Sequence, residues 1–299
     1  MKKRKVLFLC ITVAFVLLFA ACSDSAEKQN PSAPSDTPAP SAAENALDLD
    51  HFYTLSVKNT GEDESEKKYL EIAGRSQQLF PVLEEQVGAF VVDAYNYQDI
   101  DGEGTPLYTM NTLHYPQEID PNGESIRVSK NYFLHNPIEA ADGGNPAEQF
   151  IYDDLTLNLL VPQKFEDMED QIIEAWRENF YFEKVEATNQ YNHDAGIDER
   201  LDIPKEELQI NIIYVKDGQR YFTFRSDCAV QTDHWIEDPI VQIYTSNIHC
   251  NYAHSFMTQW VYFYSRKDTA RDAYQDIAPY VKECGAEQSI QQVISVSKN

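Results

Sequence analysis

A strand–helix–strand pattern in the second half of the chain limits the possible folds more than any other feature. Residues 155–161 (LTLNLLV) predict a buried strand, which ends at Pro162 because proline has no backbone N–H to donate to a sheet. An apolar stripe at helical spacing follows, formed by Phe165, Met168, Ile172, Trp176 and Phe180. The next strand is predicted at residues 209–215, so residues 155–215 make one strand–helix–strand unit.

A second unit of this kind is predicted at residues 258–296, with a helix that begins near Ser265 and ends at Gly285. The other expected elements are a helix at 64–79 that Pro81 interrupts, strands at 89–95, 221–225 and 240–244, a turn at 216–218 that joins two strands, and a polar loop at 191–201. The sequence therefore predicts an α+β fold, in which helices pack on one face of a mixed or antiparallel sheet.

The first 22 residues predict export. Four basic residues at positions 2–5 precede an apolar run of 16 residues at 6–21, which is shorter than the ~20 residues that span a bilayer. The run is typical of a signal peptide, and its end, LLFAAC, resembles the processing site of bacterial lipoproteins. We therefore expect residues 1–21 to be a signal peptide and Cys22 to carry a lipid. The alternative is an uncleaved N-terminal anchor helix.

Residues 22–48 are rich in proline, serine and alanine and have no apolar period. Such a segment cannot bury enough apolar surface to fold, so it predicts a disordered tether. Either interpretation of the N-terminus places residues 49–299 on the extracytoplasmic face of the cell membrane. This region is long enough for one large domain, and two subdomains at 49–150 and 151–299 remain possible.

The charge of the chain restricts its partners. The formal net charge is −25. Removal of residues 1–21 would remove four basic residues and no acidic one, which leaves 20 Lys and Arg against 49 Asp and Glu, or −29. This charge argues against nucleic acid as a partner, because phosphate binding requires a basic surface. It favours a soluble protein with a solvated acidic surface, and the alternative is an electrostatic site for cationic partners, including basic peptides.

Cysteines and histidines between residues 228 and 254 are the strongest candidates for chemistry. If Cys22 is lipidated, Cys228, Cys250 and Cys284 remain, which allows one disulfide and one thiol or three thiols. A zinc site could use these four ligands: Cys228, His234, His249 and His254. The spacing is poor for a metal, because the last two histidines are five residues apart. The alternative is that these residues are core thiols, a disulfide or ordinary packing groups.

Other chemical signals are weak. The sequence lacks the GxSxG, HExxH, GxxxxGK[ST], GxGxxG and CxxC motifs, and we expect no cofactor and no catalytic residue. Two nucleophile pairs remain as alternatives, Cys250–His254 and Cys228–His234. An acidic segment at 99–104 resembles part of a calcium loop, but Met110 stands where the closing glutamate belongs, which favours a simple turn.

Aromatic residues gather in the second half of the chain. Residues 262–264 (YFY) can place at most alternate rings on one side of a strand. We expect most of these aromatic side chains to lie in the core, with a peptide-binding surface as the alternative.

Several short stretches, taken in order, carry a resemblance to a known family. They are FYTLSV at 52–57, YQDI at 97–100, SIRVSKNYFLHNPI at 125–138, LLVP at 159–162 and KFEDME at 164–169. This order resembles the extracytoplasmic region of bacteriocin-associated integral membrane proteins, the FtsX-like permease partners of ABC transporters in Gram-positive bacteria. The resemblance covers roughly residues 50–180. It implies that residues 125–138 are a joint in the scaffold, with Tyr132 and Phe133 packed.

The chain departs from these permeases because no later apolar run approaches the ~20 residues of a membrane span. It would be an ectodomain without its permease. The resemblance implies a lipid-anchored, non-enzymatic accessory, sensing or binding subunit of an ABC-type export or antimicrobial-peptide system, with a membrane-transport or peptide partner. The alternatives are a secreted metal-dependent hydrolase that uses His234, His249 and His254, and a lipoprotein that binds a small ligand.

Overall fold

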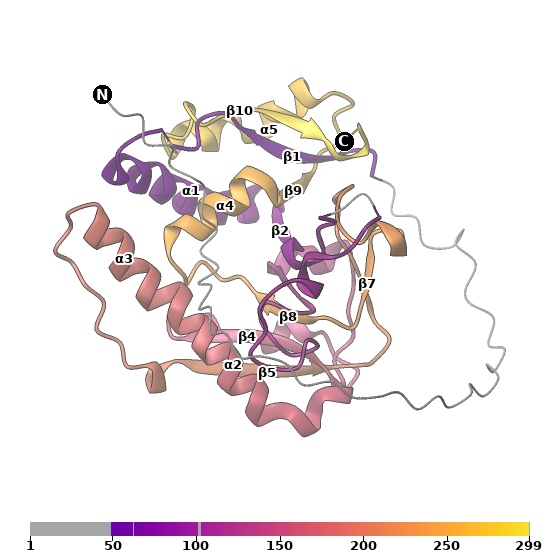
Figure 1. The fold of residues 1–299 in the computed structure, drawn as a ribbon. Helices are drawn as coiled ribbons and strands as arrows, with labels where there is room; N and C mark the ends of the chain where they lie inside the picture. The colour runs from indigo at the N-terminus through magenta and orange to yellow at the C-terminus, as the bar shows by residue number, and fades with distance from the viewer. Residues whose placement is uncertain (1–48, 62, 101–102, 299) are drawn as a thin grey trace. The chain divides into compact units, whose positions relative to one another are not determined.

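The computed structural model describes residues 49–61, 63–100 and 103–298 (Figure 1). The expected signal peptide, Cys22, the tether and Asp101 lie outside these residues. In chain order the strands are β1 (Phe52–Val57), β2 (Phe90–Asp93), β3 (Ser125–Val128), β4 (Thr156–Pro162), β5 (Gln209–Val215), β6 (Arg220–Phe222), β7 (Trp235–Glu237), β8 (Ile240–Ile243), β9 (Val261–Tyr264) and β10 (Ile290–Ser295). The α-helices are α1 (Glu66–Gln86), α2 (Glu169–Tyr181), α3 (Ala187–Asp194), α4 (Cys250–Gln259) and α5 (Ala270–Glu283).

Within the described part of the chain, eight strands form one sheet in the order β10-β1-β9-β2-β3-β8-β4-β5, and β6 pairs with β7 in a second, small sheet. The pairs β3–β8 and β4–β5 are parallel, whereas β1, β2 and β9 pair antiparallel. The predicted α+β fold with a mixed sheet is therefore confirmed.

Both predicted strand–helix–strand units are present. In the first, β4 and β5 are parallel neighbours, and α2 connects them together with α3. In the second, α5 connects β9 to β10, and both of these strands pair antiparallel with β1, which lies between them. The sheet thus contains strands from both ranges, and β1 of residues 49–150 lies between β10 and β9 of residues 151–299. The two ranges therefore share one compact unit instead of forming two subdomains.

The strand register gives the large sheet two different faces. Thr54, Phe90 and Tyr262 project from one face, which we call the aromatic face, because they occupy paired positions in β1, β2 and β9. Arg127 projects from the opposite face, and its guanidinium lies over the ring of Phe256 in α4. We call this second face the helical face.

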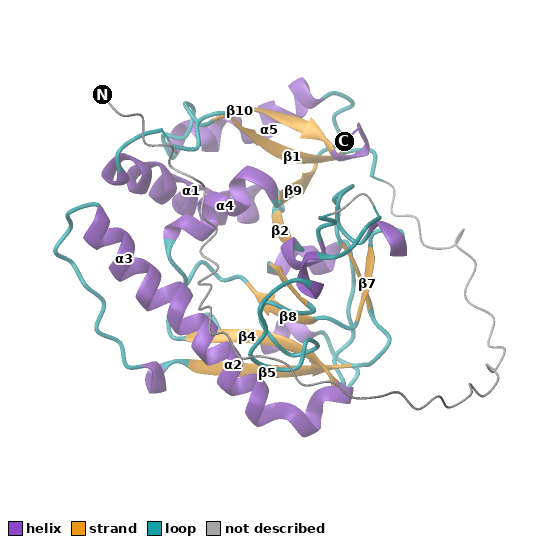
Figure 2. Cartoon of the chain, in the orientation of Figure 1, coloured by secondary structure: helices purple, strands orange, loops and turns teal. Residues whose placement is uncertain are grey.

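The long helices lie along the helical face. Figure 1 shows α4 and α5 beside β1 and β10, and α2 beside β5. Loops, short helical turns and the β6–β7 pair cover the aromatic face instead (Figure 2). The predicted packing of helices on one face of the sheet is therefore confirmed, and the opposite face is available for irregular segments.

Two helices are longer than the sequence predicted. Pro81 lies inside α1, which continues to Gln86. A proline removes one helical hydrogen bond, but Leu79, Phe80 and Leu83 around it are fully buried and hold the helix against the core. The polar loop predicted at 191–201 begins as helix, because α3 extends to Asp194.

The region after β5 also differs from the prediction. β6 pairs with β7 and not with β5, so the turn at 216–218 does not make a hairpin. Helix α4 was not predicted, although Ala253, Phe256 and Met257 have the spacing of one helix face and are buried. The last helix begins after Thr269, whose hydroxyl accepts a hydrogen bond from the Asp272 backbone N–H, and not near Ser265.

The stretch at 125–138 packs as predicted. Tyr132 and Phe133 are buried, and the Tyr132 hydroxyl accepts a hydrogen bond of 2.8 Å from the backbone N–H of Phe222. The Asn136 side chain donates to the Arg220 carbonyl at 2.9 Å. This stretch therefore fixes the β6–β7 pair over the aromatic face of the sheet.

Candidate ligand-binding cleft

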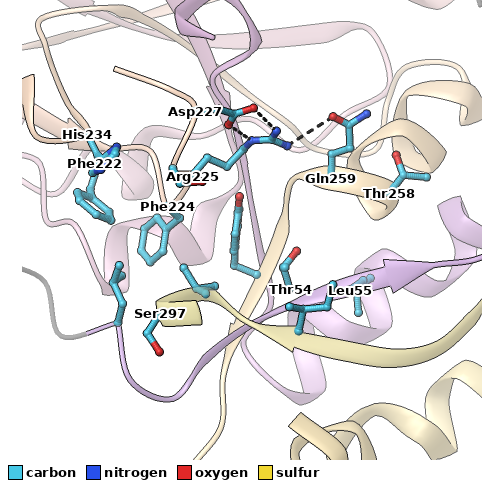
Figure 3. Close-up of a pocket in the computed structure, with 15 residues that line it drawn as sticks. Thr54, Leu55, Phe222, Phe224, Arg225, Asp227, His234, Thr258, Gln259 and Ser297 are labelled. Carbon is cyan, nitrogen blue, oxygen red and sulfur yellow. Dashed lines mark hydrogen bonds and ion pairs between the residues drawn. The ribbon is translucent and has the colours of Figure 1, made fainter. Parts of the chain in front are cut away.

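A cleft of about 530 Å³ lies on the aromatic face (Figure 3). Its lining comes from four parts of the chain: β1, β9 with the end of α4, the segment that follows β6, and the end of β10. We call it the Arg225 cleft. Thr54 and Tyr262 lie side by side in it because they are directly opposed in the β1–β9 pairing.

Aromatic rings form the inner wall of the Arg225 cleft. Phe224 packs against Tyr262, with ring centroids 5.4 Å apart, and against Phe90 at 5.1 Å. Phe222 lies at 5.1 Å from Phe224 in an edge-on arrangement. The rings therefore lie in the core, as predicted, and some of them also line a cleft.

A charged pair stands at the rim of the cleft. The Arg225 guanidinium donates two hydrogen bonds to the Asp227 carboxylate, at 2.7 and 2.6 Å, and a longer one of 3.4 Å to the side-chain oxygen of Gln259 (Figure 3). It also lies 4.3 Å from the ring centroid of Trp260. The two hydrogen bonds from Arg225, with one from Gln98, lower the pKa of Asp227 to about 2.

Backbone strain is concentrated beside this cleft. Of the seven described non-glycine residues with positive φ, five lie between residues 224 and 238: Phe224, Ala229, Asp233, His234 and Asp238. Each such conformation costs on the order of 1–3 kcal/mol and persists only where the surrounding structure enforces it, as at binding sites. Phe224 has the bulkiest of these side chains, with φ 59°, and its ring faces the cleft.

Sequence analysis identified neither Arg225 nor Gln259. Gln259 stands 34 residues after Arg225, at the end of a helix that was not predicted, so no spacing in the sequence connects them. His234 is the only one of the four predicted metal ligands that lines the cleft.

The structure does not bring the four predicted metal ligands together. His234 Nδ1 contacts the backbone oxygen of Cys228 at 3.1 Å, beside the aromatic face. His249 and His254 lie at and within α4, on the helical face, and the ring of His254 is held between the Ser76 hydroxyl and the Thr60 carbonyl. In the residues that are described, no group of three or more His, Cys, Asp or Glu side chains is arranged to hold a metal ion.

Neither predicted nucleophile pair is assembled. Cys228 is fully buried, and burial raises the pKa of its thiol. The Cys250 thiol contacts His249 Nε2 at 3.8 Å rather than His254, and burial raises its pKa to about 11. Cys228, Cys250 and Cys284 are free thiols, so the disulfide that the sequence left open is not formed among them.

His249 provides a test of the environment around α4. Its ring stacks on Tyr191, with centroids 4.8 Å apart, and burial lowers the pKa of the imidazole below its ordinary value of 6.5. The unfolded chain therefore binds more protons just below this pH, and stability is lost as the pH falls through about 6.5. We expect His249→Asn, which keeps a capping acceptor for α4, to lose less stability than the unmodified protein between about pH 7.5 and pH 5.5.

Urea unfolding at the two pH values measures this difference. His114→Asn is the control, because it removes an exposed imidazole outside α4 and tests whether replacement of any histidine has the same effect. An equal pH dependence in His249→Asn and the unmodified protein would show that His249 is not held in its neutral form.

None of the helices in the described part of the chain has the length and apolar character that a membrane crossing requires. In comparisons with known proteins, no family model, no curated protein and no solved structure matches the chain.

Proposed function

We propose that this chain is a lipid-anchored, non-enzymatic protein on the extracytoplasmic face of the cell membrane, and that it binds a peptide partner in the Arg225 cleft. It would act as an accessory or sensing subunit of an ABC-type export or antimicrobial-peptide system. The observation that carries the proposal is the construction of the cleft, which combines an aromatic wall with a single Arg–Asp pair at its rim.

This combination suits a peptide side chain. Aromatic rings offer contact area at a small cost in conformational entropy, and a few polar groups at the rim fix the orientation of a ligand. Phe222, Phe224 and Tyr262 would contact an apolar side chain, while Arg225 and Gln259 would meet the peptide backbone. The strained segment at 224–238 supports a binding role, because backbone strain of this kind is concentrated at binding and active sites.

Charge favours a cationic partner. The formal net charge of −25 attracts basic peptides over distances of about 8–10 Å at moderate salt. The expected lipid on Cys22 would hold the protein at the membrane, where such peptides act or are exported. The proposal thus unites the predicted anchor, the acidic surface and the cleft.

A substitution that fills the cleft tests the proposal. Thr258 lines the cleft from the end of α4, and we expect Thr258→Trp to weaken binding of a short amphipathic leucine–lysine peptide by about tenfold or more, or about 1.4 kcal/mol. Isothermal titration calorimetry gives the dissociation constant. Ser255→Trp is the control, because Ser255 is exposed on the same helix and does not line the cleft.

Two results would count against the proposal. Equal affinity of Thr258→Trp and Ser255→Trp would place the peptide outside the cleft. Equal affinity for a leucine–glutamate peptide of the same length would show that the negative charge of the protein does not favour a cationic partner. In cells, a photoreactive residue at the exposed cleft position Ser226 should crosslink a membrane-transport protein, whereas the same residue at Ser255 should not.

A further inference from the structure

A second, smaller cleft of about 190 Å³ lies on the helical face of the sheet. We call it the Arg127 cleft. Its lining includes the polar or charged residues Asp93, Asn122, Arg127, Asn179, Glu183 and Tyr252, and also the apolar residues Pro121 and Ile126. It shares no lining residue with the Arg225 cleft, so a ligand bound here is independent of the proposed peptide site.

A π-helical turn builds one wall of the Arg127 cleft. The turn Phe182–Glu186 lies between α2 and α3 and directs Glu183 into the protein, where its side chain is only 6% exposed. The widened turn is also held from the opposite side, because the His249 backbone N–H donates to the Glu183 carbonyl at 3.2 Å. Such π turns within helices occur frequently at functional sites.

Arg127 and Glu183 form an ion pair in which both carboxylate oxygens of Glu183 accept hydrogen bonds. One carboxylate oxygen of Glu183 accepts from Arg127 Nη2, and the other accepts from the Gln242 side chain at 3.0 Å. The same Arg127 nitrogen also donates to the Gln242 side-chain oxygen at 2.7 Å. Glu183 therefore has little capacity left for a ligand.

Asp93 is a second carboxylate beside Arg127, whose single positive charge already pairs with Glu183. Its Oδ1 accepts from the Tyr95 backbone N–H at 3.0 Å, but its Oδ2 lies 3.7 Å from Arg127 Nη1, which is too long for a hydrogen bond. Burial raises the pKa of Asp93. Arg127 Nε is buried and has no hydrogen-bond partner among the described residues. Nη1 of Arg127 makes no hydrogen bond with another described residue, so one Asp93 carboxylate oxygen and one Arg127 nitrogen, 3.7 Å apart, are both under-used.

We propose that the Arg127 cleft binds a small free α-amino acid, with the ligand's ammonium group at Asp93 and its carboxylate at the Nη1 side of Arg127. A zwitterion satisfies both groups without changing the net charge of the site. A simple cation would leave the Arg127 donor unpaired, and a simple anion would add a third negative charge beside Asp93 and Glu183. The volume is below the roughly 300 Å³ at which clefts accept drug-sized ligands, so a small solute fits better than a peptide.

Calorimetric titration of the full chain carrying Cys22→Ser with each common L-amino acid tests this inference. We expect at least one to bind, and its N-acetyl and amide derivatives, which lack one charge each, to bind at least about tenfold more weakly. Asp93→Asn should weaken binding by a similar factor. The matched control is Glu84→Gln, because Glu84 is also a buried carboxyl with a raised pKa but does not line this cleft.

A second variant keeps the test valid if Asp93→Asn does not fold. Asn122 is exposed at the cleft, so Asn122→Trp should block binding without a change in the buried cluster. The inference is overturned if no amino acid binds, if the derivatives bind as well as the parent compound, or if Asn122→Trp binds normally. It is also overturned if Thr258→Trp abolishes binding, because the ligand would then occupy the Arg225 cleft.

Discussion

Replacement of Arg127 by methionine is expected to lower the free energy of unfolding by about 3–5 kcal/mol, because it leaves buried carboxylates without their cation. Arg127 lies on the helical face with its side chain 11% exposed, and it pairs with Glu183 and faces Asp93. Its guanidinium also lies 5.2 Å from the ring centroid of Phe256, so methionine would lose this cation–π contact as well.

Urea unfolding at neutral pH measures this loss. Lys205→Met is the matched control, because the Lys205–Glu178 pair is exposed on both sides and should contribute less than about 1 kcal/mol. Adding Glu183→Gln to Arg127→Met should restore part of the stability, since it removes one of the two uncompensated charges. If Arg127→Met costs no more than Lys205→Met, the cluster does not contribute as a buried ion pair.

Replacement of Cys22 by serine is expected to release the protein from the membrane completely. Cys22 is the predicted attachment point of the lipid, and acyl chains contribute about 0.8 kcal/mol of membrane affinity for each buried CH₂ group. The unmodified protein should enter the detergent phase of a Triton X-114 partition, and Cys22→Ser should remain in the aqueous phase. Mass spectrometry of the N-terminal peptide identifies the lipid directly.

The control for this experiment is Cys284→Ser, which removes a free thiol from the folded region and should leave the partition unchanged. An unmodified protein whose N-terminal peptide still contains residues 1–21 and carries no lipid on Cys22 would support the alternative of an uncleaved N-terminal anchor helix. The outcome therefore decides between the two interpretations of residues 1–22.

The two clefts give this chain two separate recognition chemistries. The Arg225 cleft combines rings with a rim charge, whereas the Arg127 cleft is a polar site built around a buried ion pair. They lie on opposite faces of one sheet, and α4 contributes to both, with Thr258 and Gln259 in the first and Tyr252 in the second. Binding experiments on the two clefts therefore need variants from both ends of α4.

Some elements were predictable because local patterns determined them. The strand 156–162 is a mostly apolar stretch that ends at a proline, and the stripe from Ile172 to Phe180 has helical spacing, so burial and period agree. The packing of Tyr132 and Phe133 was instead an implication of the family resemblance, and both residues are buried. The net charge depends on composition alone, and export remains a prediction from the first 22 residues.

Tertiary structure decided the pairing of β6, the course of α1 through Pro81 and both clefts. β6 leaves β5 because Tyr132 and Asn136, more than 80 residues away, bond its backbone and hold it over the aromatic face. The sequence around Arg127 predicts an ordinary strand. Arg127 becomes the centre of a charged site because the sheet register places it opposite Asp93 and the π turn at residues 182–186 brings Glu183 to it. The sequence by itself thus determined the elements with strong local periodicity, and long-range contacts decided where their polar side chains meet.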